Sequence, residues 1–132
     1  MRKIFICMVA AIILAGCAGS QPVSRLSLTY PYVASLERQE QIRMGMVKVK
    51  TGMTPSEVAA VMGKTDLVHD LFERGVKDSK PIGYTWWYII QRKTDTGSTD
   101  ERAEKLVRVS FDLADKVTKV DIWGIDKPSD NN

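Results

Sequence analysis

Residues 106–123 read LVRVSFDLADKVTKVDIW, and this stretch decides the fold class. Apolar and polar residues alternate from Leu106 to Leu113, as they do in a strand with one buried face. Val117 to Trp123 repeats the pattern after the turn Ala114-Asp115-Lys116. The stretch therefore predicts an antiparallel hairpin, with one face made by Val107, Val109, Phe111 and Leu113.

A third strand is expected before this hairpin. The segment Tyr84–Gln91 is rich in aromatic and β-branched residues, and the polar segment 93–104 that follows is expected to be a mobile connection. If Trp86 and Tyr88 face the core together with Val109 and Phe111, then Trp87 and Ile89 point to the opposite side of the sheet, because side chains alternate along a strand.

A short helix is predicted over residues 55–62. Thr54-Pro55-Ser56-Glu57 has the form of a capping box, with proline at the first helical position. Val58, Val61 and Met62 then follow at helical spacing, and Gly63 supplies a stop.

Two segments are less regular. Residues 33–49 place Val33, Leu36, Ile42, Met46 and Val49 on one helical face, although Ile42, Met44 and Met46 also alternate as in a strand, and helix is favoured. Residues 64–82 are mostly polar and are expected to form a loop with one short helical or extended piece. The fold class expected is α+β, with two N-terminal helices on one face of a three-stranded antiparallel sheet, in the order α-α-β-β-β.

The N-terminus has the form of a bacterial lipoprotein signal. Arg2 and Lys3 precede an apolar run from Ile4 to Ala15, and Leu14-Ala15-Gly16-Cys17 matches a lipobox. The run is shorter than the roughly 20 residues that a spanning helix needs. We expect cleavage before Cys17 and lipidation of its thiol, so that the acyl chains attach the mature protein to a membrane.

The expected domains follow from this signal. Residues 1–16 are the signal peptide, 17–32 a lipidated flexible tether, 33–125 the folded domain and 126–132 a disordered tail. Because Ala18 is not the aspartate that retains lipoproteins in the inner membrane, the periplasmic face of the outer membrane of a Gram-negative cell is favoured. Loss of Arg2 and Lys3 lowers the formal net charge from +3 to +1, which gives no case for nucleic-acid binding.

Catalytic chemistry finds little support in the mature chain. His69 is the only histidine, and no residue spacing is typical of a metal site. Asp112 and Asp115 are interpreted as turn residues. Cys7 leaves with the signal and Cys17 takes the lipid, so no disulfide is expected. We therefore expect no enzyme, no cofactor and no metal.

A binding face is the alternative to a catalytic site. Trp87, Ile89 and Trp123, with Arg108 beside them, form the candidate partner-binding face, since Trp and Arg are enriched in interface hot spots. The tether, the 64–82 segment or a further helix could instead cover these side chains, and the sequence does not decide between the two.

The ordered set of motifs resembles one known family. Gly52-Met53-Thr54 with Val58 and Gly63, then Thr85-Trp86-x-Tyr88, and Val109-x-Phe111 with Val117-x-x-Val120 resemble the SmpA/OmlA (BamE-like) outer-membrane lipoproteins over roughly residues 45–125. The chain departs from the family at Gln91, where arginine is usual, and at Lys64-Thr65, where proline is common. The resemblance implies two helices followed by a three-stranded sheet, a fold also similar to that of β-lactamase inhibitor proteins.

The resemblance also implies a function. It predicts a non-enzymatic binding or scaffold module in β-barrel assembly or envelope maintenance, with envelope proteins, barrel-assembly components and anionic phospholipid as partners. The alternative is a lipoprotein inhibitor or sensor that binds a periplasmic enzyme through its sheet face. A small hydrolase would require a cleft with a perturbed acid or base, which the sequence does not indicate.

Overall fold

The computed structural model describes residues 28–126. The predicted signal peptide, Cys17, the predicted tether up to residue 27 and the predicted tail from residue 127 lie outside the described residues. The elements are, in chain order, β1 (Tyr32–Val33), α1 (Leu36–Met46), α2 (Pro55–Met62), β2 (Leu67–Phe72), β3 (Pro81–Arg92), α3 (Thr99–Arg102), β4 (Lys105–Asp112) and β5 (Val117–Trp123).

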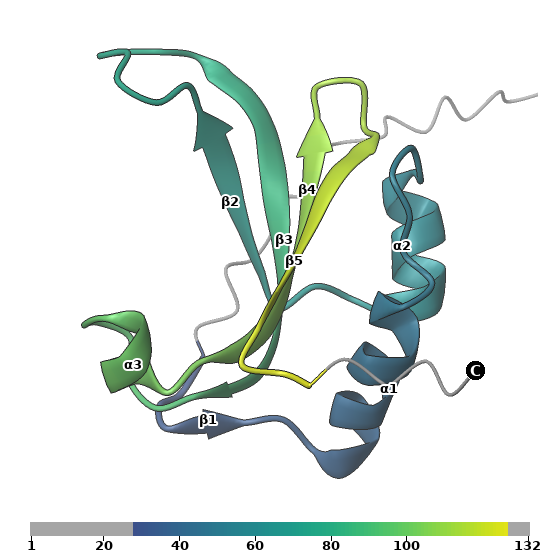
Figure 1. Cartoon of the computed structure of the whole chain (residues 1–132), viewed down its shortest axis with the longest axis vertical. Helices are drawn as coiled ribbons and strands as arrows, with labels where there is room; N and C mark the ends of the chain where they lie inside the picture. The colour runs from purple at the N-terminus through teal and green to yellow at the C-terminus, as the bar shows by residue number, and fades with distance from the viewer. Residues whose placement is uncertain (1–27, 127–132) are drawn as a thin grey trace, which may run out of the picture.

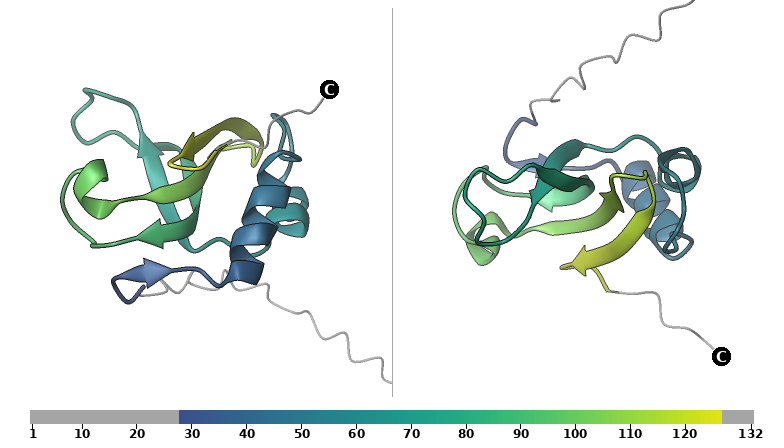
Figure 2. Two further views of the ribbon diagram at one scale, coloured as in Figure 1. Left: turned by 60° about the horizontal axis from the view of Figure 1, so that its bottom comes forward. Right: turned by 90° about the horizontal axis from the view of Figure 1, so that it is seen from above.

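One antiparallel sheet organises the domain (Figure 1). Its strands run in the order β1-β3-β4-β5, and β2 also pairs with β3. Helices α1 and α2 lie together on one side of the sheet, whereas α3 lies away from them in the connection between β3 and β4 (Figure 2). We call the side of the sheet that α1 and α2 cover the inner face, and the opposite side the outer face.

The expected three-stranded α-α-β-β-β arrangement is wrong. The described chain has five strands: β1 precedes α1, and β2 lies between α2 and β3. The reason lies in β3, which has 12 residues against the 8 of β4. The edge of β3 that faces away from β4 needs partners for its backbone groups, and β2 and β1 pair with its first and last parts.

The predicted second helix is confirmed by its caps. The hydroxyl of Thr54 accepts from the backbone N–H of Glu57 at 3.3 Å, and the Glu57 carboxylate accepts from the N–H of Thr54 at 2.8 Å. Helix α2 begins at Pro55 and ends at Met62, and it is capped by Gly63, which has a φ of 75° that favours glycine. This local chemistry sets both ends of α2.

The inner face carries the main hydrophobic core. Residues from both helices pack against β3, β4 and β5, and the largest fully buried side chains among them are Tyr88, Phe111, Ile42, Met62, Ile90, Val58, Val107, Val109 and Val117. The predicted core side of β4 is confirmed for Val107, Val109 and Phe111, but Leu113 is exposed at the turn. In α1, Ile42 and Met46 are buried as predicted, whereas Leu36 is exposed.

Arg38 ties α1 to the end of α2. Its guanidinium donates to the backbone oxygen of Met62 at 2.7 Å and to that of Lys64, and it lies 5.5 Å from the centre of the Tyr88 ring. The Tyr88 hydroxyl donates to the Gly63 oxygen at 3.2 Å. These donors supply partners for carbonyls that every helix leaves unpaired at its C-terminus, so one helix and one strand together hold the end of α2.

Replacing Gly45 by alanine should destabilise the fold, although the same change in an open helix stabilises it. An added Cβ would overlap the Val61 oxygen and lie 2.8 Å from Met62 Cγ, so α1 and α2 would have to separate. We expect Gly45→Ala to lower the free energy of unfolding by about 1–3 kcal/mol in urea denaturation. The exposed neighbour Met44, changed to alanine, should shift it by less than about 0.5 kcal/mol. An unfolding free energy that rises in Gly45→Ala would contradict the close helix contact.

Asp66 gives the fold a specific pH dependence. Its carboxylate accepts from the N–H of Ile89 at 2.7 Å and lies 3.7 Å from Arg38, but burial outweighs both and raises the pKa of Asp66 above its ordinary 3.8. A carboxyl group whose pKa is higher in the folded protein than in the unfolded chain contributes stability that is fully present below its unfolded pKa. This contribution is lost as pH rises through its folded pKa.

We therefore expect wild type to lose stability relative to Asp66→Asn between about pH 3 and about pH 7. Urea midpoints of both proteins across this range measure the difference. A difference that is constant, or that grows in favour of wild type as pH rises, would contradict the prediction.

Candidate functional site

The outer face of the sheet is built around Trp87. In register, Trp87 of β3 pairs with Leu67 of β2 on one side and with Arg108 of β4 on the other. The Arg108 guanidinium carbon lies 4.2 Å from the centre of a Trp87 ring, which is cation–π geometry. The ring of His69, from β2, approaches Trp87 to 4.5 Å between centroids at an angle of 50°.

The four residues predicted to form the partner-binding face differ in how much of their side chains is exposed. Trp87 is partly buried, and Arg108 contacts it with 32% of its side chain exposed. Trp123 is 50% exposed at the end of β5, whereas Ile89 is fully buried and therefore offers no surface to a partner. Ile89 and Trp123 belong to one cross-strand row, since both pair in register with Leu106. Cys17 lies outside the described residues.

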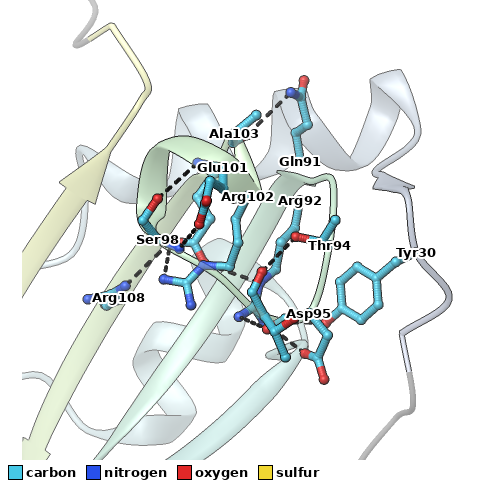
Figure 3. A network of polar contacts seen from close by, with 12 residues as sticks. Tyr30, Gln91, Arg92, Thr94, Asp95, Ser98, Glu101, Arg102, Ala103 and Arg108 are labelled. Carbon is cyan, nitrogen blue, oxygen red and sulfur yellow. Dashed lines mark hydrogen bonds and ion pairs between the residues drawn. The ribbon is translucent and has the colours of Figure 1, made fainter.

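Sequence reasoning missed a buried carboxylate next to this face. The Glu104 side chain is fully buried, and its Oε1 lies 2.9 Å from Nε of Arg102 and 3.1 Å from Nε of Arg92. Figure 3 labels the arginines of this cluster, Arg92, Arg102 and Arg108. Its second oxygen lies 3.8 Å from Arg108. Three guanidinium groups thus surround one carboxylate, as the charge of Glu104 requires in a dry environment.

The connection between β3 and β4 positions this cluster. Ser98 and Glu101 form a second capping box, in which the Ser98 hydroxyl accepts from the Glu101 N–H at 3.3 Å and the Glu101 carboxylate accepts from the Ser98 N–H at 2.6 Å. Hydrogen bonding to Ser98 lowers the pKa of Glu101. The Lys93 N–H donates to the Arg102 oxygen at 2.7 Å. The segment 93–104, which was expected to be mobile, is therefore held by hydrogen bonds. Its Ser-x-x-Glu pattern at Ser98 and Glu101 is the sequence signal that could have predicted α3.

A pocket of about 470 Å³ opens beside Trp87. It combines aromatic rings, two leucines, one cation and one carboxylate, and its lining residues are Leu28, Tyr30, Leu67, His69, Trp87, Arg92 and Asp95. The Tyr30 hydroxyl lies 3.3 Å from Arg92, and burial raises the pKa of Tyr30. His69, expected to lie in a loop, is in β2 at this pocket because β2 pairs with β3.

The features of the outer face are those of a surface that can bind another molecule. Between residues 28 and 126, no three His, Cys, Asp or Glu side chains gather where they could hold a metal ion. Within the same range, no helix combines the length and apolar character needed to span a membrane. Stacked Trp and Arg, a half-exposed Trp and a lined pocket are features of an interaction surface.

Comparisons with known proteins give one weak likeness and no family. No family model matches the chain, and no curated protein matches it. A solved structure described as a putative osmotically inducible lipoprotein, OsmE, is 23% identical, covers 63% of this chain and 80% of its own, and superposes with a TM-score of 0.41. At this TM-score the likeness carries no argument about fold or function.

Removing the charge of Glu104 should destabilise the domain. Glu104→Gln would leave Arg92, Arg102 and Arg108 without their buried counter-charge, and loss of one partner from such a group costs about 3–5 kcal/mol. Thermal or urea unfolding measures the loss. Asp100→Asn, an exposed neighbour in α3, is the control and should change the free energy of unfolding by less than about 0.5 kcal/mol. Equal stability of both variants would show that the cluster contributes nothing.

Proposed function

We propose that this chain is a lipid-anchored envelope protein that binds a partner protein on the outer face of its sheet and performs no catalysis. The observation that carries the proposal is the contact of Trp87 with Arg108, beside the half-exposed Trp123 and the pocket. Trp and Arg are enriched in interface hot spots, because Trp offers a large apolar area with one N–H donor and Arg offers five N–H donors. Neither α1 nor α2 covers this face (Figure 2).

The position of Leu28, the first described residue, supports a membrane-tethered role. Leu28 and Tyr30 line the pocket, so the described part of the chain begins at the candidate binding face. The ten residues between Cys17 and Leu28 let these two positions lie at most about 40 Å apart when the chain is extended. A lipid on Cys17 would therefore hold this face within about 40 Å of the membrane surface.

The lipobox and Ala18 favour the periplasmic face of the outer membrane as the site of action. With the resemblance to BamE-like lipoproteins, they lead us to propose β-barrel assembly or envelope maintenance as the process, and envelope proteins, including barrel-assembly components, as the partners. Of the four candidate residues, Trp123 is the one with a large exposed side chain and is the best contact for a partner.

A photo-crosslinking amino acid at position 123, in the lipidated protein in cells, tests the proposal. We expect a specific crosslinked partner from position 123 and none from position 113, because Leu113 is even more exposed than Trp123 but lies at the β4–β5 turn. Trp123→Ala should weaken co-purification of that partner by about tenfold or more, the range of a hot-spot residue, while Leu113→Ala leaves it unchanged.

The identity of the partner discriminates among functions. Recovery of barrel-assembly components would support the proposed process. A soluble periplasmic enzyme that binds equally well to a chain without its lipid would favour the inhibitor function instead. Crosslinks of equal strength from positions 123 and 113 would contradict a defined binding face.

A further inference from the structure

The outer face carries more positive charge than the buried carboxylate neutralises. Arg92, Arg102 and Arg108 all approach Glu104, so two positive charges remain after it is counted. Asp95 lies 3.7 Å from Arg92 and is 71% exposed. Because water screens an exposed carboxylate, Asp95 neutralises only part of one of these two charges. In a partly dry environment such an excess attracts an anion more strongly than it would in open water.

The excess charge is accessible on one side of Trp87. The side chains of Arg102 and Arg108 are 21% and 32% exposed, whereas that of Arg92 is 7% exposed and engaged with Glu104, Asp95 and Tyr30. Each guanidinium has five N–H donors, and a single carboxylate cannot accept from all of those that converge on Glu104. Arg102 and Arg108 therefore retain donors for a second acceptor.

The pocket lies on the other side of Trp87 and suits an apolar group. Leu28, Tyr30, Leu67, His69 and Trp87 provide an apolar and aromatic lining, and the volume of about 470 Å³ falls in the range of small-ligand sites. Arg92 and Asp95 lie at this pocket as an ion pair, so its walls do not select strongly for charge. A pocket with aromatic and aliphatic walls and a cationic site thus flank the same tryptophan.

We propose that the outer face binds an acidic peptide segment of the partner that carries one aromatic or large aliphatic side chain. The apolar side chain enters the pocket beside Trp87, and a neighbouring carboxylate accepts from Arg108 and Arg102, the bidentate pairing that guanidinium favours. This inference rests on the proposed function and defines the chemistry of the partner.

The mature lipidated chain in uncharged detergent micelles can be titrated with three short peptides, acetylated and amidated at their ends. The probes are Glu-Phe-Asp-Glu, its apolar-deleted form Glu-Ala-Asp-Glu, and its charge-reversed form Lys-Phe-Lys-Lys. Tryptophan fluorescence of the protein reports binding, since none of the peptides contains tryptophan. We expect Glu-Phe-Asp-Glu to bind at least about tenfold more tightly than either other peptide, and to weaken between about 50 mM and about 500 mM salt.

Variants locate the anion site. Arg102→Gln should weaken the acidic peptide severalfold, as should Arg108→Lys, which keeps the charge but loses the planar bidentate fork. Lys119→Gln is the matched control, because Lys119 is an exposed cation on β5 paired with Asp121 at 2.9 Å, and it should leave binding unchanged. The Arg102 variant keeps the test valid if Arg108→Lys perturbs Trp87.

Two outcomes overturn the inference. Equal binding of the acidic and basic peptides would remove the anion site, and equal binding of the alanine peptide would remove the apolar anchor. If either occurs while position 123 still crosslinks to a partner in cells, the inference fails and the proposed function stands. If position 123 also gives no crosslink, both fail.

Discussion

The strand β3 is the constraint on which the rest of the structure depends. Its 12 residues pair with β1, β2 and β4, so three other strands are aligned along this one segment. Its side chains alternate between two occupied faces, with Tyr88 in the main core and Trp87 on the outer face. A shift of one residue would exchange these two aromatic side chains and disrupt both faces at once.

The inner face shows how short helices obtain stability from tertiary contacts. Helix α2 has only 8 residues, too few to be stable alone in water. Its start is fixed by its own capping box, whereas its end depends on Arg38 from α1 and Tyr88 from β3. The close approach of the helices at Gly45 makes these contacts possible, because a side chain there would overlap α2. The helix pair and the sheet therefore stabilise one another.

The outer face is organised by charge rather than by a second layer of helices. A fully buried Glu104 needs cations around it, and three arginines from β3, α3 and β4 supply them. One of these arginines also stacks on Trp87, so the group that neutralises Glu104 shapes the candidate binding face. Burying these charges costs solvation energy, and three arginines around one carboxylate leave this side of the sheet with an excess of positive charge.

The sequence by itself determined the parts of the fold that depend on neighbouring residues. Thr54 to Glu57 is sufficient for a capping box, and the alternation of Val107, Val109 and Phe111 assigned the core side of β4. Only the tertiary structure decided that residues 67–72 form a strand and that Glu104 is buried among arginines. The physical reason is that both features depend on residues distant in the sequence. Strand β2 is stabilised by pairing with the edge of β3, and Glu104 is stabilised by arginines up to twelve positions away. Neither kind of contact produces a periodic pattern in the local sequence.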